Sequence, residues 1–487
     1  MTGRPNDNGR VSYARKAVGT ATVLRGVTVV DTRDGSLTTN QDVSTANGRI
    51  TGITTADPQD NACQAIDLSG KYVVPGYLDM HAHPLGDGDR TGTLRLMLTR
   101  GITGFRQMSG SLKLLKQRQN GTLPMPAESP DVVQMPGAVL TPLNAGSVKT
   151  AVTTVREQHA AGADFIKVGL VTPSVFFAAQ HEANRLGVPI LGHLPVGIDV
   201  IEASARGMKS IEHLGPGVGI LAACSTEKTA LLAALNAKPI KALPFRIPFA
   251  DQLFLPMLRK MILNPYAAQG HQAVDVMRRA IDTFSEELAR ELARRFVADG
   301  TWQVPTLIRE CTCKISDAPE FRDDPNHRFV DPSTLKQWHD SGHRFDSLPT
   351  DTRDTFRDSY ELELKITKIF DEEGVKILAG SDCSGAAWEV PGHSLHQELD
   401  AFAKAGLSPL RVLQTTTLNG AEFLDTSATM GTVEIGKVAD LVVLQDNPIE
   451  SIQNMHAVDG VMRAGQYYSN SDLGSIEQAV ATARSVN

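Results

Sequence analysis

The chain has 487 residues, of which 41% are hydrophobic and 21% are charged, and its formal net charge is −7. This length exceeds one ordinary domain, and the balance of apolar and charged residues excludes a disordered chain. A surface for nucleic acid or for an anionic membrane needs clustered Lys and Arg, and the sequence has no strong basic run.

Cysteine usage and the first residues bear on the location of the protein. Five cysteines, odd in number and irregularly spaced, indicate a reducing compartment. Residues 1–20 are polar without an apolar core, which predicts a flexible tail and not a signal peptide. No run of about 18 apolar residues is present either. We therefore expect a cytoplasmic protein with a small-molecule substrate and with no nucleic-acid or membrane partner.

The two ends of the chain share one pattern. Residues 21–74 contain short runs rich in β-branched residues, separated by turn signals at Asp34-Gly35 and Asn47-Gly48. The same pattern returns in 428–470. A small composite β-sandwich formed by both chain ends implies that a larger domain is inserted in it. The sequence pattern of residues 471–487 predicts a helical C-terminal tail.

Between these ends, residues 75–427 alternate short apolar strands with helices. The strands after the first are predicted near 102–105, 164–168, 188–191, 208–211, 302–307 and 375–379. The helices between them stop at Gly187, Gly207, Gly300 and Gly374. Such alternation predicts an α/β fold of the (β/α)8 or TIM-barrel type, whose working groups lie at the C-terminal ends of the strands.

Residues able to bind a metal follow these strands. His81 and His83 close the first strand, and because they are two residues apart they point to the same side of it. The other candidates close later strands: Lys167 the fourth, His193 the fifth, His213 the sixth and Asp382 the eighth. A closed barrel brings all strand ends to one mouth. Protonated Lys167 would repel a metal, whereas its CO2-derived carbamate would be an anion able to bridge two cations.

Five motifs carry a resemblance to a known family. They are residues 75–83, 162–167, 192–193, 210–213 and 380–382, with 431–444 in addition. With these motifs the chain resembles the amidohydrolase superfamily in its dinuclear carbamyl-lysine subtype. Within it, the chain is most similar to the branch of Xaa-Pro dipeptidases, imidazolonepropionase-related enzymes and ochratoxinase-like amidases. The resemblance covers most of residues 21–468.

The resemblance implies two divalent metal ions and a role for each ligand. His81, His83 and Asp382 would hold one ion, His193 and His213 the other, and Lys167, as N6-carboxylysine, would bridge both. A metal-bridging hydroxide would attack the substrate carbonyl, and catalytic Asp382 would pass its proton to the leaving nitrogen. Zn²⁺ suits these donors best, with Mn²⁺ and Co²⁺ as alternatives.

Four more residues are candidates for substrate contact. Arg106, after the second strand, and Arg309, after the seventh, could clamp a substrate carboxylate or form structural ion pairs. The family often has Val-Arg-Asp where this chain has Phe105-Arg106-Gln107. His393 and His396 follow the eighth strand, and their spacing fits either substrate contact or a helix start.

The barrel has two long insertions, 217–284 and 308–357. Within the first, residues 243–266 are strongly apolar and contain several prolines, so we expect either a hydrophobic lid or an interface of a homo-oligomer. From Glu310 onward the second insertion is charged and contains proline, which predicts a mobile excursion over the mouth.

The sequence thus favours a metal-dependent hydrolase of an amide C–N bond. The expected substrate is an N-acyl amino acid or an Xaa-Pro-like dipeptide with a bulky hydrophobic group, and the alternative is a carbamate or urea, including xenobiotic ones. A mononuclear deaminase fits less well, because His193 is followed by Leu194-Pro195-Val196 where such enzymes usually carry a Glu, and because they lack the bridging lysine. A non-catalytic scaffold also fits less well, because all six ligands are present.

Overall fold

A computed structural model describes residues 21–57, 65–237 and 262–485. The predicted flexible tail 1–20 lies outside the described residues. So does most of the apolar segment 243–266, of which only residues from Ile262 onward are described.

Parallel strands form a closed ring. One sheet contains β6 (Tyr77–Ala82), β7 (Ile102–Gln107) and β8 (Asp131–Gln134), and a second contains β9 (Ile166–Val168), β10 (Ile190–Gly192), β11 (Met208–Glu212) and β12 (Trp302–Val304). Single parallel bridges join them: Leu140 to Val168, Gln303 to Ile377 and Ala82 to Cys383. Residues 377–383 therefore occupy the eighth strand position, and the predicted barrel is confirmed.

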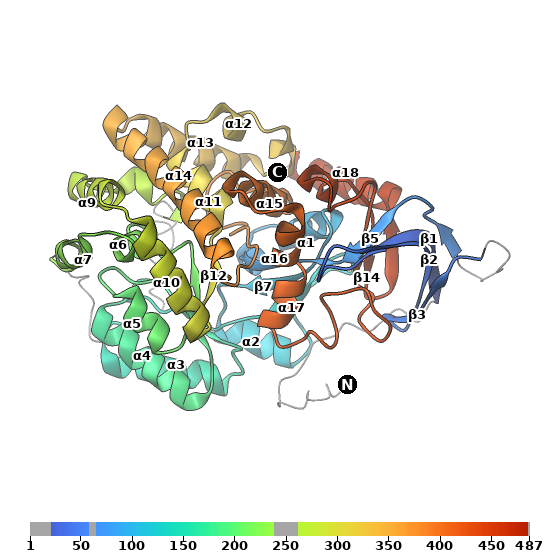
Figure 1. The fold of residues 1–487 in the computed structure, drawn as a ribbon, viewed down its shortest axis with the longest axis horizontal. Coiled ribbons are helices and arrows are strands. Elements are labelled where there is room, and N and C mark those ends of the chain that lie inside the picture. The colour runs from blue at the N-terminus through green and yellow to red at the C-terminus, as the bar shows by residue number, and fades with distance from the viewer. Residues whose placement is uncertain (1–20, 58–64, 238–261, 486–487) are drawn as a thin grey trace.

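Helices surround this ring (Figure 1). Up to the seventh strand they are α1 (Arg90–Thr99), α2 (Leu112–Gln119), α3 (Val148–Ala160), α4 (Pro173–Leu186), α5 (Val200–Ala205), α6 (Gly219–Ala223), α7 (Lys228–Asn236), α9 (His271–Asp282) and α10 (Glu286–Asp299). After it follow α11 (Leu307–Lys314), α12 (Pro319–Arg322), α13 (Pro332–Asp346), α14 (Thr350–Glu372), α15 (His393–Ala405), α16 (Pro409–Thr415) and α17 (Leu418–Phe423). As predicted, α4 and α10 end at Gly187 and Gly300, which adopt the left-handed conformation that glycine tolerates best.

Both chain ends contribute to one eight-stranded sheet, at the right of Figure 1. From the first part of the chain come β1 (Thr22–Val30), β2 (Leu37–Ala46), β3 (Arg49–Thr55), β4 (Ala65–Asp67) and β5 (Tyr72–Pro75); from the last come β13 (Leu441–Leu444), β14 (Val458–Arg463) and β15 (Gln466–Ser469). The two groups join where β5 pairs with β1 on one side and with β13 on the other. Because β5 leads directly into β6, this sheet anchors the first barrel strand.

The segment after Glu310 differs from the prediction. Instead of a mobile excursion it is a helical layer that includes α12, α13 and the start of α14, with Phe321, Trp338 and Trp388 buried in a common apolar cluster. Several of its charged residues pair with one another, as Arg322 does with Asp346 at 2.7 Å. The segment is therefore built of packed amphipathic helices and is not an irregular excursion.

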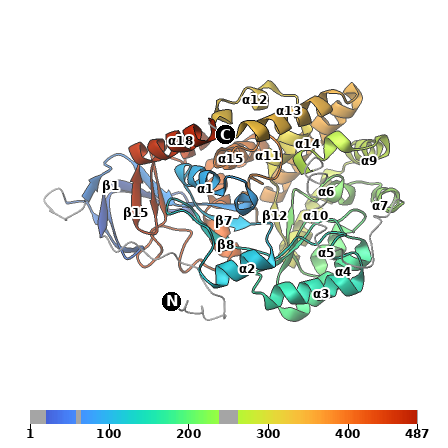
Figure 2. The same cartoon turned by 180° about the vertical axis from the view of Figure 1, so that it is seen from behind.

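The C-terminal segment is a docked helix. α18 (Asn470–Ser485) packs against α1 and against η3 (Pro325–Phe329), as Figures 1 and 2 show. Arg484 at its end donates to the Thr93 hydroxyl at 2.9 Å and to Asp89 at 3.0 Å. Across residues 21–57, 65–237 and 262–485, no helix combines the length and apolar character needed to cross a membrane.

Candidate metal centre

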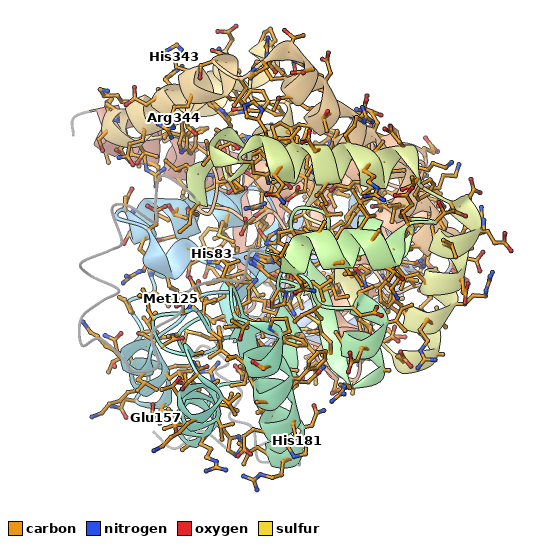
Figure 3. All side chains as sticks on the ribbon, turned by 90° about the vertical axis from the view of Figure 1, so that its left-hand side faces the viewer. His83, Met125, Glu157, His181, His343 and Arg344 are labelled. Carbon is orange, nitrogen blue, oxygen red and sulfur yellow. The ribbon has the colours of Figure 1, made fainter. Side chains whose placement is uncertain are left out.

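Three of the predicted ligands meet where the first and eighth strands end. Asp382 Oδ1 lies 3.1 Å from His81 Nε2 and 3.0 Å from His83 Nε2. Their donor atoms all fall within 4.8 Å of one another, which suits a single metal ion. The backbone holds this arrangement, because the Asp382 N–H donates to the His81 carbonyl at 2.7 Å. Figure 3 shows His83 near the centre of this face of the molecule.

The other three candidates adjoin this group. Lys167 Nζ lies 3.4 Å from His81 Nε2. The ring of His213 stands 4.6 Å from that of His81 and 5.0 Å from that of His193, measured between centroids. The six residues predicted from the ends of five different strands therefore form one contiguous cluster, which we call the six-residue cluster.

The ionisation states in the cluster suit a divalent cation. Burial, reinforced by neighbouring cations, holds the pKa values of His193 and His213 well below the usual value, so both imidazoles are neutral. Burial opposes ionisation of Asp382, but the adjacent His81 and His83 more than offset it, and its pKa lies well below its usual range. Neutral imidazoles beside a carboxylate are the donor set that Zn²⁺ and similar ions prefer.

Residues 364–467 of the chain match the amidohydrolase family. This segment of the chain is therefore similar to that family. This match, which spans the eighth strand position and the last strands of the β domain, confirms the family predicted from the sequence.

Curated relatives match the chain over parts of their length. A dihydroorotase of Anoxybacillus flavithermus is 26% identical over 181 residues, which are 36% of this chain and 42% of that protein. An imidazolonepropionase of Halobacterium salinarum is 38% identical over 66 residues, 14% of this chain and 16% of that protein. The chain thus spans less than half the length of these relatives.

Solved structures match almost the whole fold. A bottromycin amidohydrolase has a TM-score of 0.67 at 21% identity, covering 95% of this chain and 90% of that one. An Xaa-Pro dipeptidase with bound methionine has a TM-score of 0.57 at 17% sequence identity, and the match covers 93% of this chain and 100% of that one. The ochratoxinase of A. niger has a TM-score of 0.58 at 17% sequence identity, and the match covers 93% of this chain and 96% of that one. At these identities the likeness establishes the fold, a TIM barrel with a β domain.

The barrel also brings to the cluster a residue, Glu212, that was not among the predicted site residues. Glu212, the last residue of β11, is fully buried, and its Oε2 lies 2.6 Å from His81 Nδ1. Arg106 Nη2 donates to the same carboxylate at 3.0 Å, and Ser210 Oγ at 2.7 Å. A signal was available, because Glu212 directly precedes a predicted ligand in the motif 210–213.

Left-handed backbone conformations gather at the cluster. His213, Asp382 and Thr306 have φ angles of +57°, +55° and +46°. Such angles are uncommon for residues other than glycine and rarest for a β-branched residue such as threonine. Each costs conformational energy that the surrounding structure must offset, as is frequent where side chains are held for function.

The two arginine candidates occupy different environments. Arg309 lies in the cluster, with Nε 2.6 Å from Asp382 Oδ2 and Nη1 donating to Glu310 Oε1 at 2.7 Å. Arg106 is fully buried behind the cluster, where Nε donates to the Met80 carbonyl at 2.6 Å. Its burial and its bonds to Glu212 favour the structural ion pair over contact with substrate.

The two histidine candidates lie elsewhere. The ring of His393 stacks on Phe329 with centroids 5.5 Å apart. His396 Nε2 donates to the Arg100 carbonyl at 2.8 Å, and its Nδ1 lies 2.6 Å from His456 Nδ1. Among the described residues, neither histidine has a recorded contact with the six-residue cluster.

Proposed function

We propose that the protein is a metal-dependent hydrolase that cleaves an amide-type C–N bond at the six-residue cluster. The observation that carries this proposal is the convergence of neutral imidazoles and an ionised carboxylate at one end of an amidohydrolase-family barrel. One divalent ion would be held by His81, His83 and Asp382, a second by His193 and His213, and carboxylated Lys167 would bridge them.

Lys167 is suited to carboxylation. Burial lowers its pKa from 10.5 to about 8, which enlarges the neutral fraction of the amine. Only the neutral amine reacts with CO2. When bound, divalent ions supply Lewis acidity, which polarises a carbonyl and lowers the pKa of water.

Asp382 is the proposed proton carrier. Its ionised form can accept a proton from the attacking water and deliver it to the leaving nitrogen. Arg309 beside Oδ2 orients this carboxylate and places a cation where an anionic substrate group can be attracted.

Two exposed apolar residues near the proposed ligands would contact a bulky substrate group. Leu170 and Val196 follow β9 and β10, each three residues beyond a proposed ligand, and their side chains are 47% and 42% exposed. Two large exposed apolar side chains on adjacent strand ends support an N-acyl amino acid or Xaa-Pro-like dipeptide with a hydrophobic group. The cytoplasmic location and the homo-oligomeric state stay predictions from the sequence.

Metal analysis together with a substrate panel tests the proposal. We expect about two equivalents of Zn²⁺ per chain, hydrolysis of N-acyl amino acids or Xaa-Pro dipeptides, and loss of both in Lys167→Ala but not in the control Lys209→Ala. If the protein instead prefers carbamates or ureas in the same panel, the alternative function, a carbamate or urea hydrolase, replaces the amide hydrolase. A fully metal-loaded protein inactive on every C–N bond of the panel contradicts the proposal.

A further inference from the structure

We propose that Glu398, on α15, is a positioning residue for the hydrolysis, because it holds the start of α11 and thereby places Arg309 against Asp382. Glu398 acts through the backbone of α11 and not through direct contact with the reacting groups. This inference rests on the proposed function, because the orienting role of Arg309 at Asp382 belongs to that function.

The start of α11 makes two contacts with the six-residue cluster. Thr306, the residue before the helix, has its Oγ1 2.5 Å from His213 Nδ1. Arg309, the third residue of α11, has its Nε 2.6 Å from Asp382 Oδ2. A displacement of this first turn would therefore disturb both contacts at once.

α11 has no cap of its own. The first N–H groups of a helix have no partner inside the helix, and the side chain of the preceding residue usually accepts from one of them. Ser147 and Ser285 do this at the starts of α3 and α10. The Thr306 side chain does not, because its hydroxyl lies 2.7 Å from the Pro305 carbonyl and faces His213. The start of α11 thus needs an acceptor from another part of the chain.

Glu398 supplies that acceptor. Its Oε2 accepts the N–H of Ile308, the second residue of α11, at 2.7 Å and across 90 residues of chain. Glu398 is fully buried and Ile308 is 4% exposed, so loss of the carboxyl would leave a buried N–H group without its acceptor, which is costly. Because α15 packs directly against α11, the anchor is part of the packed helical layer.

The contact needs an oxygen acceptor and not a charge. Burial raises the pKa of the Glu398 carboxyl to about 8. A carboxyl group keeps an acceptor oxygen in both protonation states, and the side-chain amide of Gln offers one in the same place. Gln should therefore replace Glu398, whereas Met, of similar length, should not.

The kinetic test compares these two substitutions. A misplacement of about 1 Å can cost about 100-fold in rate, so we expect Glu398→Met to lower kcat about 10- to 100-fold at unchanged metal content, and Glu398→Gln to stay within about twofold of the wild type. In an Arg309→Met background, Glu398→Met should lower kcat no further, because the effect passes through Arg309.

A matched control separates this role from a loss of stability. Asp42 is a buried carboxylate in the β domain, where it accepts from the Gly26 N–H at 3.0 Å. Asp42→Leu also leaves a backbone N–H without its acceptor, but away from α11, and it should leave kcat unchanged. All variants are assayed at a temperature at which circular dichroism shows them folded.

Amide hydrogen exchange, read by mass spectrometry with residue resolution, tests the anchor without metal or substrate. In the wild type, the Ile308 amide should exchange as slowly as the amides in the middle of α11, although first-turn amides usually exchange fast. This measurement holds even if Glu398→Met does not fold. Where that variant folds, the exchange at Ile308 should be faster, and Glu398→Gln should restore the slow rate.

The outcomes distinguish this inference from the proposed function. Slow exchange at Ile308, a fall of kcat in Glu398→Met and its absence in Glu398→Gln support the positioning role. Fast exchange at Ile308 in the wild type, a normal kcat in Glu398→Met, or a further fall of kcat in the double variant overturns it and leaves the proposed function standing if two ions and hydrolysis persist. A wild type that hydrolyses no C–N bond overturns the proposed function and with it the role of Glu398 in hydrolysis.

Discussion

Arg309 joins the proposed proton carrier Asp382 to a second buried carboxylate. Its Nε lies 2.6 Å from Asp382 Oδ2, and its Nη1 donates to Glu310 Oε1 at 2.7 Å. Glu310 Oε2 in turn accepts from the Tyr266 hydroxyl at 2.6 Å and lies 3.1 Å from Lys314 Nζ. Asp382 is therefore oriented from both sides, by histidines at Oδ1 and by this buried network at Oδ2.

The first prediction concerns Arg309. Arg309→Met should lower kcat for C–N bond hydrolysis about 100-fold at unchanged metal content, because Asp382 loses the group that orients Oδ2. Removing a cation also raises the pKa of a carboxyl, so the acidic limb of the pH–rate profile should move to higher pH. Arg309→Lys should retain part of the activity. Steady-state kinetics measured across pH test this prediction, and Arg344→Met serves as the control. If Arg309→Met keeps a normal kcat and its acidic limb does not move, Arg309 does not orient Asp382.

Metal reloading tests Lys167. Its pKa, lowered by burial to about 8, means that the ammonium predominates below that pH and the neutral amine above it. Protein stripped with a chelator should therefore recover its second Zn²⁺ only with bicarbonate present, and more completely as the pH rises through about 8. Lys167→Arg should not recover it at any pH. Full reloading of the wild type at pH 6 without bicarbonate would rule out the carbamate.

Substrate preference tests the apolar mouth. If Leu170 and Val196 contact a hydrophobic substrate group, the double change to Ala should raise KM about 10-fold for substrates with a bulky group and leave small substrates unaffected. Leu112→Ala provides the control, because that side chain is 50% exposed on α2. Equal effects on bulky and small substrates would show that the two side chains do not select the substrate.

Stability at acidic pH tests the buried His396. Burial lowers its pKa from 6.5 to about 3, so between these values the unfolded chain binds a proton that the folded chain does not. The group therefore lowers the free energy of unfolding as the pH falls below about 6.5, by roughly 1.4 kcal/mol per pH unit.

Urea unfolding between pH 7.5 and 5 measures this effect. His396→Gln cannot titrate, and its stability should fall less steeply with decreasing pH than that of the wild type. The exposed His343, changed to Gln, should leave the slope unaltered. If the free energy of unfolding falls with pH at the same slope in all three proteins, a group other than His396 causes the acid sensitivity.

The sequence by itself determined the order of the elements and the positions of the candidate ligands. The two-residue period of a strand places His81 and His83 on one side, and glycine stops such as Gly187 and Gly300 mark helix ends, because both signals are local. The (β/α)8 pattern then implies that all strand ends share one mouth. That these residues bind metal is still a proposal.

Only the tertiary structure decided which buried groups support the cluster. Glu212 meets His81 across 131 residues of chain, and Thr306 meets His213 across 93. Such contacts depend on how the ring closes and how side chains pack, which no local period encodes. The same reason explains Arg106, whose position after a strand fits substrate contact equally well until its burial against Glu212 is seen. It also explains the charged segment after Glu310, whose apolar face is recognisable only once Trp388 packs on it.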